Sequence, residues 1–172
     1  MPPRMRKFAL TAHVVFSVGW IGAVASFLAL AVAGLTTSDA QVVSAAYLAM
    51  ETISWFVIVP LSLASPLTGI IQSLGTDWGL FRHYWVLIKL LMTIPSTIFL
   101  LFHMRPISHL ASAVAETTLP GGDLSGLRVQ LAADAGAALV VLLVATTLAM
   151  YKPRGMTRYG ARKHGEQRAL GF

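Results

Sequence analysis

Two basic side chains stand inside apolar stretches of the sequence, where an ionisable group is unfavourable. His13 lies six residues after Lys7, and Lys89 lies seven residues after Arg82. At 1.5 Å of helical rise per residue, both would lie about 10 Å inside the membrane surface that Lys7 and Arg82 mark. Intramembrane ionisable residues are rare, and they usually face a bundle interior, pair with each other or bind a ligand. The pair therefore predicts a cationic or proton-sharing pocket that an anionic or electron-rich group completes.

Each of these side chains also has a purely structural explanation. Lys89 can snorkel, with its stem along the helix and its ammonium at the headgroups. A neutral His13 can simply hydrogen-bond a neighbouring helix. Spacing favours a site, because His13 and Trp20 share one helix face and Trp85 begins a stripe that includes Lys89.

A heme or a related porphyrin suits such a lining. His13 would be an axial ligand or a proton acceptor, and Lys89 would pair with a propionate or approach the metal. Trp20 and Trp85 would belong to the apolar wall around the ring. We therefore expect heme b as the cofactor, with His13 and Lys89 carrying electron transfer or porphyrin redox chemistry in a membrane oxidoreductase.

A second polar set is expected in the outer half of the membrane. Glu51, His103 and Asp134 come from three different apolar stretches, and their depths agree within about two helical turns. They could bind a divalent or copper cation or relay protons. Alternatively, Asp134 and Glu51 could pair with His103 and Arg105 to fix the order of the helices. The absence of cysteine excludes any thiolate metal site.

The elements that must position these residues are membrane-spanning helices. The chain is 56% hydrophobic and only 12% charged, whereas soluble domains carry roughly a quarter of charged residues. Four apolar stretches are long enough to cross about 30 Å of hydrocarbon. We predict an all-α, integral membrane four-helix bundle with spans over residues 8–35, 42–74, 84–104 and 129–151, followed by a basic tail over 152–172.

The basic residues predict the orientation of this bundle. With both termini in the cytoplasm, only Arg105 and Arg128 would lie outside, which is the positive-inside pattern. The net charge of +6 is thereby explained by topology, so nucleic acid is not an expected partner. We expect a multi-pass protein of the bacterial inner (plasma) membrane whose tail contacts anionic lipid.

Local signals predict where the helices begin and end. Ser38, with Gln41 three residues later, forms a capping box that would open the second helix. Pro60 and Pro66 fall inside that helix and favour kinks. Residues 106–127 are expected to form a long outer loop that contains a short surface helix.

Two windows resemble known bacterial membrane families. "AHVVFSVGWIGAV" in the first span looks like CopD-type copper-resistance membrane domains, and together with "HYWVLIKLL" it resembles HemJ-type protoporphyrinogen oxidases. The second resemblance implies heme binding, with His13 and Lys89 as the functional pair. The chain departs from that oxidase pattern in its long outer loop and basic tail. The next histidine after Lys89 is also distant, at His103.

Other function classes receive less support from the sequence. There is no Walker loop, dinucleotide fingerprint, zinc-protease motif or nucleophile elbow, so hydrolysis is not expected. A non-enzymatic alternative is a small membrane partner subunit, or a homo-oligomer, whose polar residues only lock helices together.

Overall fold

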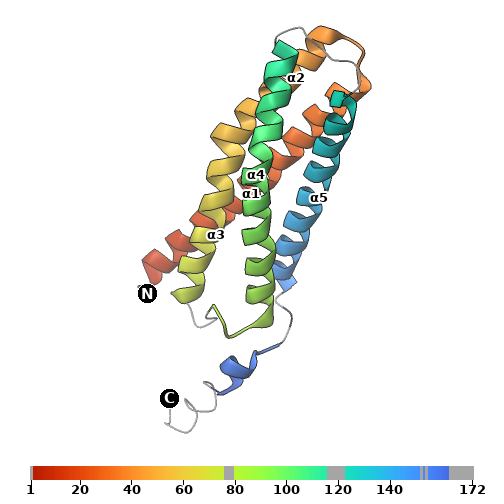
Figure 1. The fold of residues 1–172 in the computed structure, drawn as a ribbon. Helices are drawn as coiled ribbons and strands as arrows, with labels where there is room; N and C mark the ends of the chain where they lie inside the picture. The colour runs from red at the N-terminus through yellow and green to blue at the C-terminus, as the bar shows by residue number, and fades with distance from the viewer. Residues whose placement is uncertain (1, 76–79, 116–122, 152, 154, 163–172) are drawn as a thin grey trace.

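The computed structural model describes residues 2–75, 80–115, 123–151, 153 and 155–162, and it is built of long helices. The long helices lie side by side, and consecutive ones run in opposite directions (Figure 1). The elements are α1 (Pro3–Thr36), α2 (Ala40–Ile53), the π-helical turn η1 (Ser54–Ile58), α3 (Val59–Leu74), α4 (Tyr84–Ala115) and α5 (Asp123–Tyr151).

Four helical stretches are long and apolar enough to cross a membrane. They are Pro3–Thr36, Ala40–Leu74, Tyr84–Ser112 and Ser125–Tyr151, with mean hydropathy between 1.8 and 2.1. The second stretch joins α2, η1 and α3 into one rod. All-helical folding and four potential spans are therefore confirmed, since α-helices satisfy every backbone polar group inside lipid.

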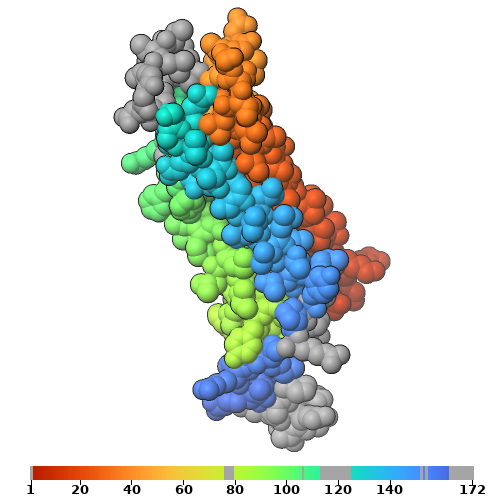
Figure 2. All heavy atoms as spheres, turned by 90° about the vertical axis from the view of Figure 1, so that its right-hand side faces the viewer, coloured from red at the N-terminus to blue at the C-terminus, as the bar shows by residue number. Residues whose placement is uncertain are grey.

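The contacts between helices show which helices are neighbours in the bundle and which lie diagonally opposite each other. α1 packs against α2, α3 and α5, while α4 packs against α2, α3 and α5. α5 lies between α1 and α4 on one side of the bundle, as Figure 2 shows. α1 and α4 therefore lie diagonally opposite each other and share no packed helix–helix seam.

The hydrophobic core is concentrated in the half of the bundle that contains the α1–α2 connection, which is called the outer half after the predicted orientation; the half with the N-terminus is called the inner half. Trp20 and Phe27 of α1 pack with Tyr47 and Met50 of α2 and with Leu110 of α4. Met50 and Leu110 are fully buried, whereas large apolar side chains such as Phe8 and Phe102 remain about three-quarters exposed, at 76% and 74%. An apolar exterior of this kind is what contact with lipid tails requires.

Proline inside α3 creates an unpaired carbonyl that a neighbouring helix satisfies. Pro66 has no N–H, so the Ser62 carbonyl one turn earlier loses its helical partner. The Thr97 hydroxyl of α4 donates to this carbonyl at 3.1 Å. Ser62 and Thr97 are both buried, so this bond ties α3 to α4 inside the bundle.

Two predicted boundaries were wrong. Asp39, not Ser38, caps α2, because its Oδ1 accepts hydrogen bonds from the backbone N–H groups of Gln41 at 2.8 Å and Val42 at 3.5 Å. The outer loop is shorter than predicted, because α4 continues through Pro106 to Ala115. Burial of Ile107, Leu110 and Ala111 in that extension outweighs the helix-breaking tendency of proline.

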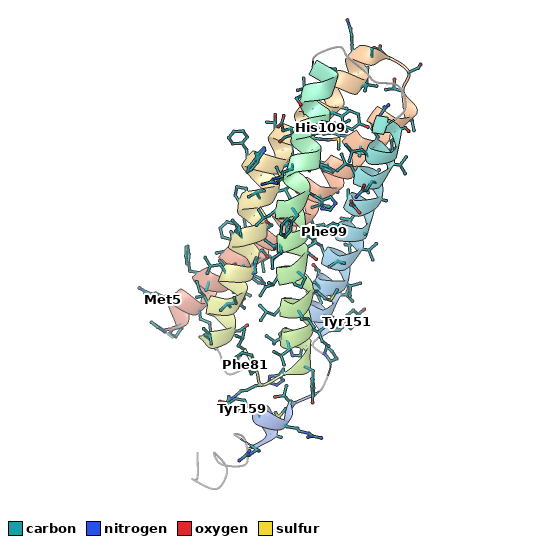
Figure 3. The ribbon with its side chains drawn as sticks, viewed as in Figure 1. Met5, Phe81, Phe99, His109, Tyr151 and Tyr159 are labelled. Carbon is teal, nitrogen blue, oxygen red and sulfur yellow. The ribbon has the colours of Figure 1, made fainter. Side chains whose placement is uncertain are left out.

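Part of the basic tail is docked on the turn that precedes α4. The Thr157 N–H donates to the Arg82 carbonyl at 2.9 Å, and the Tyr84 N–H donates to the Gly155 carbonyl at 3.3 Å. A Cβ at Gly160 would lie 2.4 Å from the Arg82 oxygen, so this approach requires glycine. Figure 3 shows Phe81 and Tyr159 together at this end. The predicted lipid contact of residues 163–172 lies outside the described residues.

Candidate functional site

His13 is held by α3 through one ring nitrogen. Its Nδ1 lies 3.0 Å from the Ser65 carbonyl oxygen and 3.2 Å from the Thr68 hydroxyl oxygen. The Thr68 hydroxyl donates its own proton back to the Ala64 carbonyl at 2.7 Å. Both neighbours of Nδ1 therefore act as acceptors, and Nδ1 must carry the proton.

This tautomer leaves the other ring nitrogen of His13 available. With the proton on Nδ1, Nε2 of the neutral ring presents a lone pair. Within the described part of the chain, Nε2 has no hydrogen-bond partner. Metal-binding histidines typically donate one ring N–H to a backbone carbonyl and use the other nitrogen as the ligand. His13 thus has the geometry of a pre-oriented ligand.

A glycine makes room for this ring on α3. A Cβ built on Gly69 would lie 3.0 Å from Cε1 of His13, which is tighter than most real Cβ contacts, so the ring would have to shift. The imidazole therefore packs directly over the α3 backbone. Gly69 and the Ser65 carbonyl together define where the ring sits.

Lys89 of α4 is half-buried and has no acidic partner. Its Nζ lies over the Trp85 ring at 5.9 Å from the ring centroid. No carboxylate of the described residues forms an ion pair with Lys89, so its charge is not neutralised there. Neither hydrogen bond of His13 involves Lys89, and the nearest ring recorded for the ammonium is that of Trp85 on its own helix.

An apolar groove of about 480 Å³ adjoins the His13 side of the bundle. α1 and α3 form it together, and Thr68, which contacts His13, is one of its walls. Lys89 is not part of the lining. The groove is lined by Arg4, Met5, Phe8, Ala9, Ala12, Thr68 and Ile71.

The two predicted wall tryptophans have different positions. Trp20 is 4% exposed and belongs to the hydrophobic core, about 10 Å along α1 from His13 by helical rise. Trp85 lies one turn before Lys89 and beneath its ammonium. The structure therefore places Trp85 beside Lys89, whereas Trp20 lies in the core away from His13.

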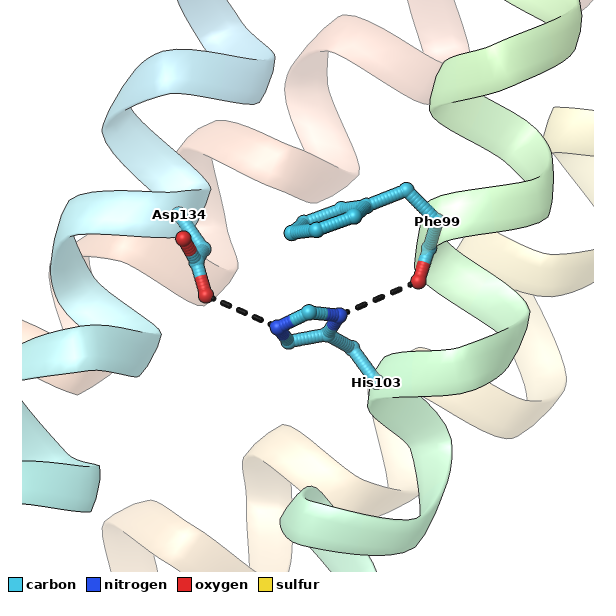
Figure 4. A network of polar contacts seen from close by, with 3 residues as sticks. All are labelled: Phe99, His103 and Asp134. Carbon is cyan, nitrogen blue, oxygen red and sulfur yellow. Dashed lines mark hydrogen bonds and ion pairs between the residues drawn. The ribbon is translucent and has the colours of Figure 1, made fainter.

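In the outer half, the structure brings His103 and Asp134 together. Nε2 of His103 lies 2.9 Å from Oδ2 of Asp134, and the two side chains are 17% and 29% exposed (Figure 4). The Phe99 ring stacks on the imidazole, with ring centroids 3.9 Å apart. Oδ2 is buried, and no hydrogen bond of regular geometry reaches it from the described residues.

Both ring nitrogens of His103 face oxygen atoms. Nδ1 lies 3.1 Å from the Phe99 carbonyl, and Nε2 faces the Asp134 carboxylate. A carbonyl can only accept, so Nδ1 carries a proton. One further proton between Nε2 and Oδ2 would make His103 and Asp134 a pair without net charge.

Glu51, the third residue of the predicted cation site, lies elsewhere. The Trp55 indole N–H donates to the Ser108 hydroxyl at 3.5 Å, which sets the register of the α2–η1 rod against α4. In that register Glu51 lies about 13 Å from the level of His103 along the bundle. No group of three or more His, Asp or Glu residues with metal-binding geometry occurs among the described residues.

Sequence reasoning missed a clamp at the outer end. Arg128 of α5 donates from Nε to the Tyr47 hydroxyl at 2.9 Å and from an η nitrogen to the Gly34 carbonyl. Its guanidinium also lies over the Tyr47 ring, 5.4 Å from the centroid. From the sequence, Arg128 contributes only to the predicted orientation of the bundle. The signal for the clamp was an arginine and a tyrosine near the same ends of two spans, but pairing them required the helix order.

Comparison with known proteins identifies no relative. No protein-family model, curated protein or solved structure matches the chain.

Proposed function

We propose that the protein binds a heme or a related porphyrin at His13 and Lys89 and supports electron transfer or porphyrin redox chemistry. The observation that carries this proposal is the imidazole of His13, whose Nδ1 faces the Ser65 carbonyl while Nε2 has no partner among the described residues. An apolar groove beside it supplies the low-polarity surroundings that a porphyrin ring prefers.

The donor chemistry of the site fits a heme. Nε2 of His13 offers the iron a neutral nitrogen ligand, and the Ser65 carbonyl holds the ring in the required tautomer. Lys89 has no acidic partner among the described residues, so its positive charge is available to a heme propionate. When bound, the heme would supply one-electron chemistry, and the protein would supply ligation, charge neutralisation and exclusion of water.

The membrane setting of this site also belongs to the proposal. Met5 and Tyr151 lie at one end of the bundle and His109 toward the other, as Figure 3 shows. The positive-inside pattern supports a cytoplasmic location for the Met5 end in a bacterial inner membrane. Arg158 and Arg162 are exposed there, which favours contact of the tail with anionic lipid.

The test is the visible absorbance spectrum of the full-length protein, purified in detergent and supplemented with hemin. We expect a Soret band whose ligation signature disappears in His13→Ala. Lys89→Met should keep the band and weaken heme affinity roughly tenfold, which corresponds to the loss of one partly desolvated ion pair.

His109→Ala is the matched control, because His109 is an exposed histidine of the outer half and lies far from His13. Its spectrum should equal that of the unaltered protein. A missing Soret band in the unaltered protein, or a band that persists unchanged in His13→Ala, contradicts the proposal.

A further inference from the structure

A second cavity lies where α2 passes into η1, and its lining differs in character from the groove near His13. It has a volume of about 440 Å³ and is lined by Glu51, Thr52, Trp55 and Phe56. It therefore combines one carboxylate, one hydroxyl and two large aromatic rings.

The Glu51 carboxylate has no positively charged partner among the residues that the structure describes. It is half-buried, and it forms no hydrogen bond or ion pair with any other described residue. The two described arginines of the outer end do not neutralise it, because Arg128 is engaged by Tyr47 and Gly34 and Arg105 is exposed on α4. A carboxylate in this position attracts a cation from outside the chain.

The π-helical turn presents the two aromatic rings beside this carboxylate. η1 begins three residues after Glu51 and contains both Trp55 and Phe56. The Trp55 indole is anchored on α4 by Ser108, and yet 49% of the residue remains exposed; Phe56 is 79% exposed. π-helical turns often occur at functional sites, because the wider turn re-aims side chains.

Carboxylate and aromatic rings together select an organic cation rather than a metal ion. A hard metal ion needs several oxygen ligands, and the cavity offers one carboxylate and one hydroxyl. Aromatic faces attract alkylammonium groups through the ring quadrupole. We propose that this cavity binds an alkylammonium group, carried either by a phospholipid headgroup of the outer leaflet or by a soluble organic cation.

The first experiment uses the full-length protein in an uncharged maltoside detergent, with tetramethylammonium chloride as the probe. Saturation-transfer NMR should detect binding, and Glu51→Gln should weaken it about tenfold, which corresponds to about 1.4 kcal/mol. Trp55→Leu should also weaken binding, by about fivefold. Thermal unfolding of each variant checks that the fold is retained.

Asp39→Asn is the matched control for charge. It removes another carboxylate of the same end, and asparagine caps a helix as well as aspartate does. Binding should be unchanged in this variant. An equal loss of binding in Asp39→Asn would mean that only the general negative charge attracts the probe, and it would overturn the proposal.

The second experiment separates the two sources of the ammonium group. Native mass spectrometry of protein from bilayers of phosphatidylethanolamine and phosphatidylglycerol should show retained ethanolamine lipid that Glu51→Gln loses, if the source is lipid. Binding of tetramethylammonium without any such lipid preference assigns the site to a soluble cation. If Glu51→Gln changes neither measurement, the proposal is wrong. This site is independent of the His13 site, so heme binding can fail without affecting it.

Discussion

The two halves of the bundle differ in whether their charged side chains have partners on other helices. In the outer half, α5 supplies Arg128 and Asp134, and each meets a partner on another helix. In the inner half, Nε2 of His13 and the ammonium of Lys89 have no acidic partner among the described residues. Paired groups lock helices together, whereas unpaired groups inside a membrane protein remain available to a ligand.

Glu51 extends this comparison. It lies in the outer half but resembles the inner pair, because it too has no oppositely charged partner among the described residues. Unlike His13 and Lys89, it lines a cavity directly. The presence or absence of an oppositely charged partner therefore says more about the role of a charged residue than its depth in the bundle does. The paired residues are best tested by stability, and the unpaired ones by binding.

The largest expected effect is the loss of the Arg128 clamp. Arg128→Met should lower the free energy of unfolding by about 2–4 kcal/mol, because the Tyr47 hydroxyl and the Gly34 carbonyl both lose a charged donor. Unfolding by denaturing detergent measures the change. Arg105→Met, at an exposed position, should change the stability by less than about 0.5 kcal/mol. Equal effects of the two substitutions would show that the clamp contributes nothing.

An intermediate effect is expected for the neutral outer pair. A double-mutant cycle with His103→Gln and Asp134→Asn should give a favourable coupling energy of about 1–2 kcal/mol, because each single change leaves the other charge unpaired. The same unfolding assay provides the four stabilities. Strict additivity of the two substitutions would exclude the ion pair as a contributor to stability.

The smallest effect has the opposite sign and concerns the inner half. Lys89→Met should stabilise the ligand-free protein by about 1 kcal/mol, because it removes an unneutralised charge from a partly buried position. Lys7→Met, at an exposed position near the start of α1, is the control and should be close to neutral. Destabilisation by Lys89→Met would instead indicate that the ammonium has a structural role.

Several features of the fold follow from the sequence alone. The apolar stretches predicted four long helices, since only helices of that length bury their backbone groups in lipid. The isolated positions of His13 and Lys89 within those stretches singled them out before any helix was placed. The exact helix boundaries were harder to predict, as the cap at Asp39 and the continuation of α4 through Pro106 show. Neighbouring residues can serve equally well as a cap, and the burial of a few side chains can extend a helix past a proline.

The tertiary structure decided which polar groups meet. Asp134 pairs with His103, Arg128 reaches Tyr47, and Glu51 stands apart from all four. Helical rise gives the depth of a residue, but it does not give the order of helices around the bundle or their relative register. Those depend on packing between residues far apart in the chain, such as the contact of Trp55 with Ser108. The sequence therefore determined that charged groups enter the membrane, and the packing of the helices determined which of them are left without a partner.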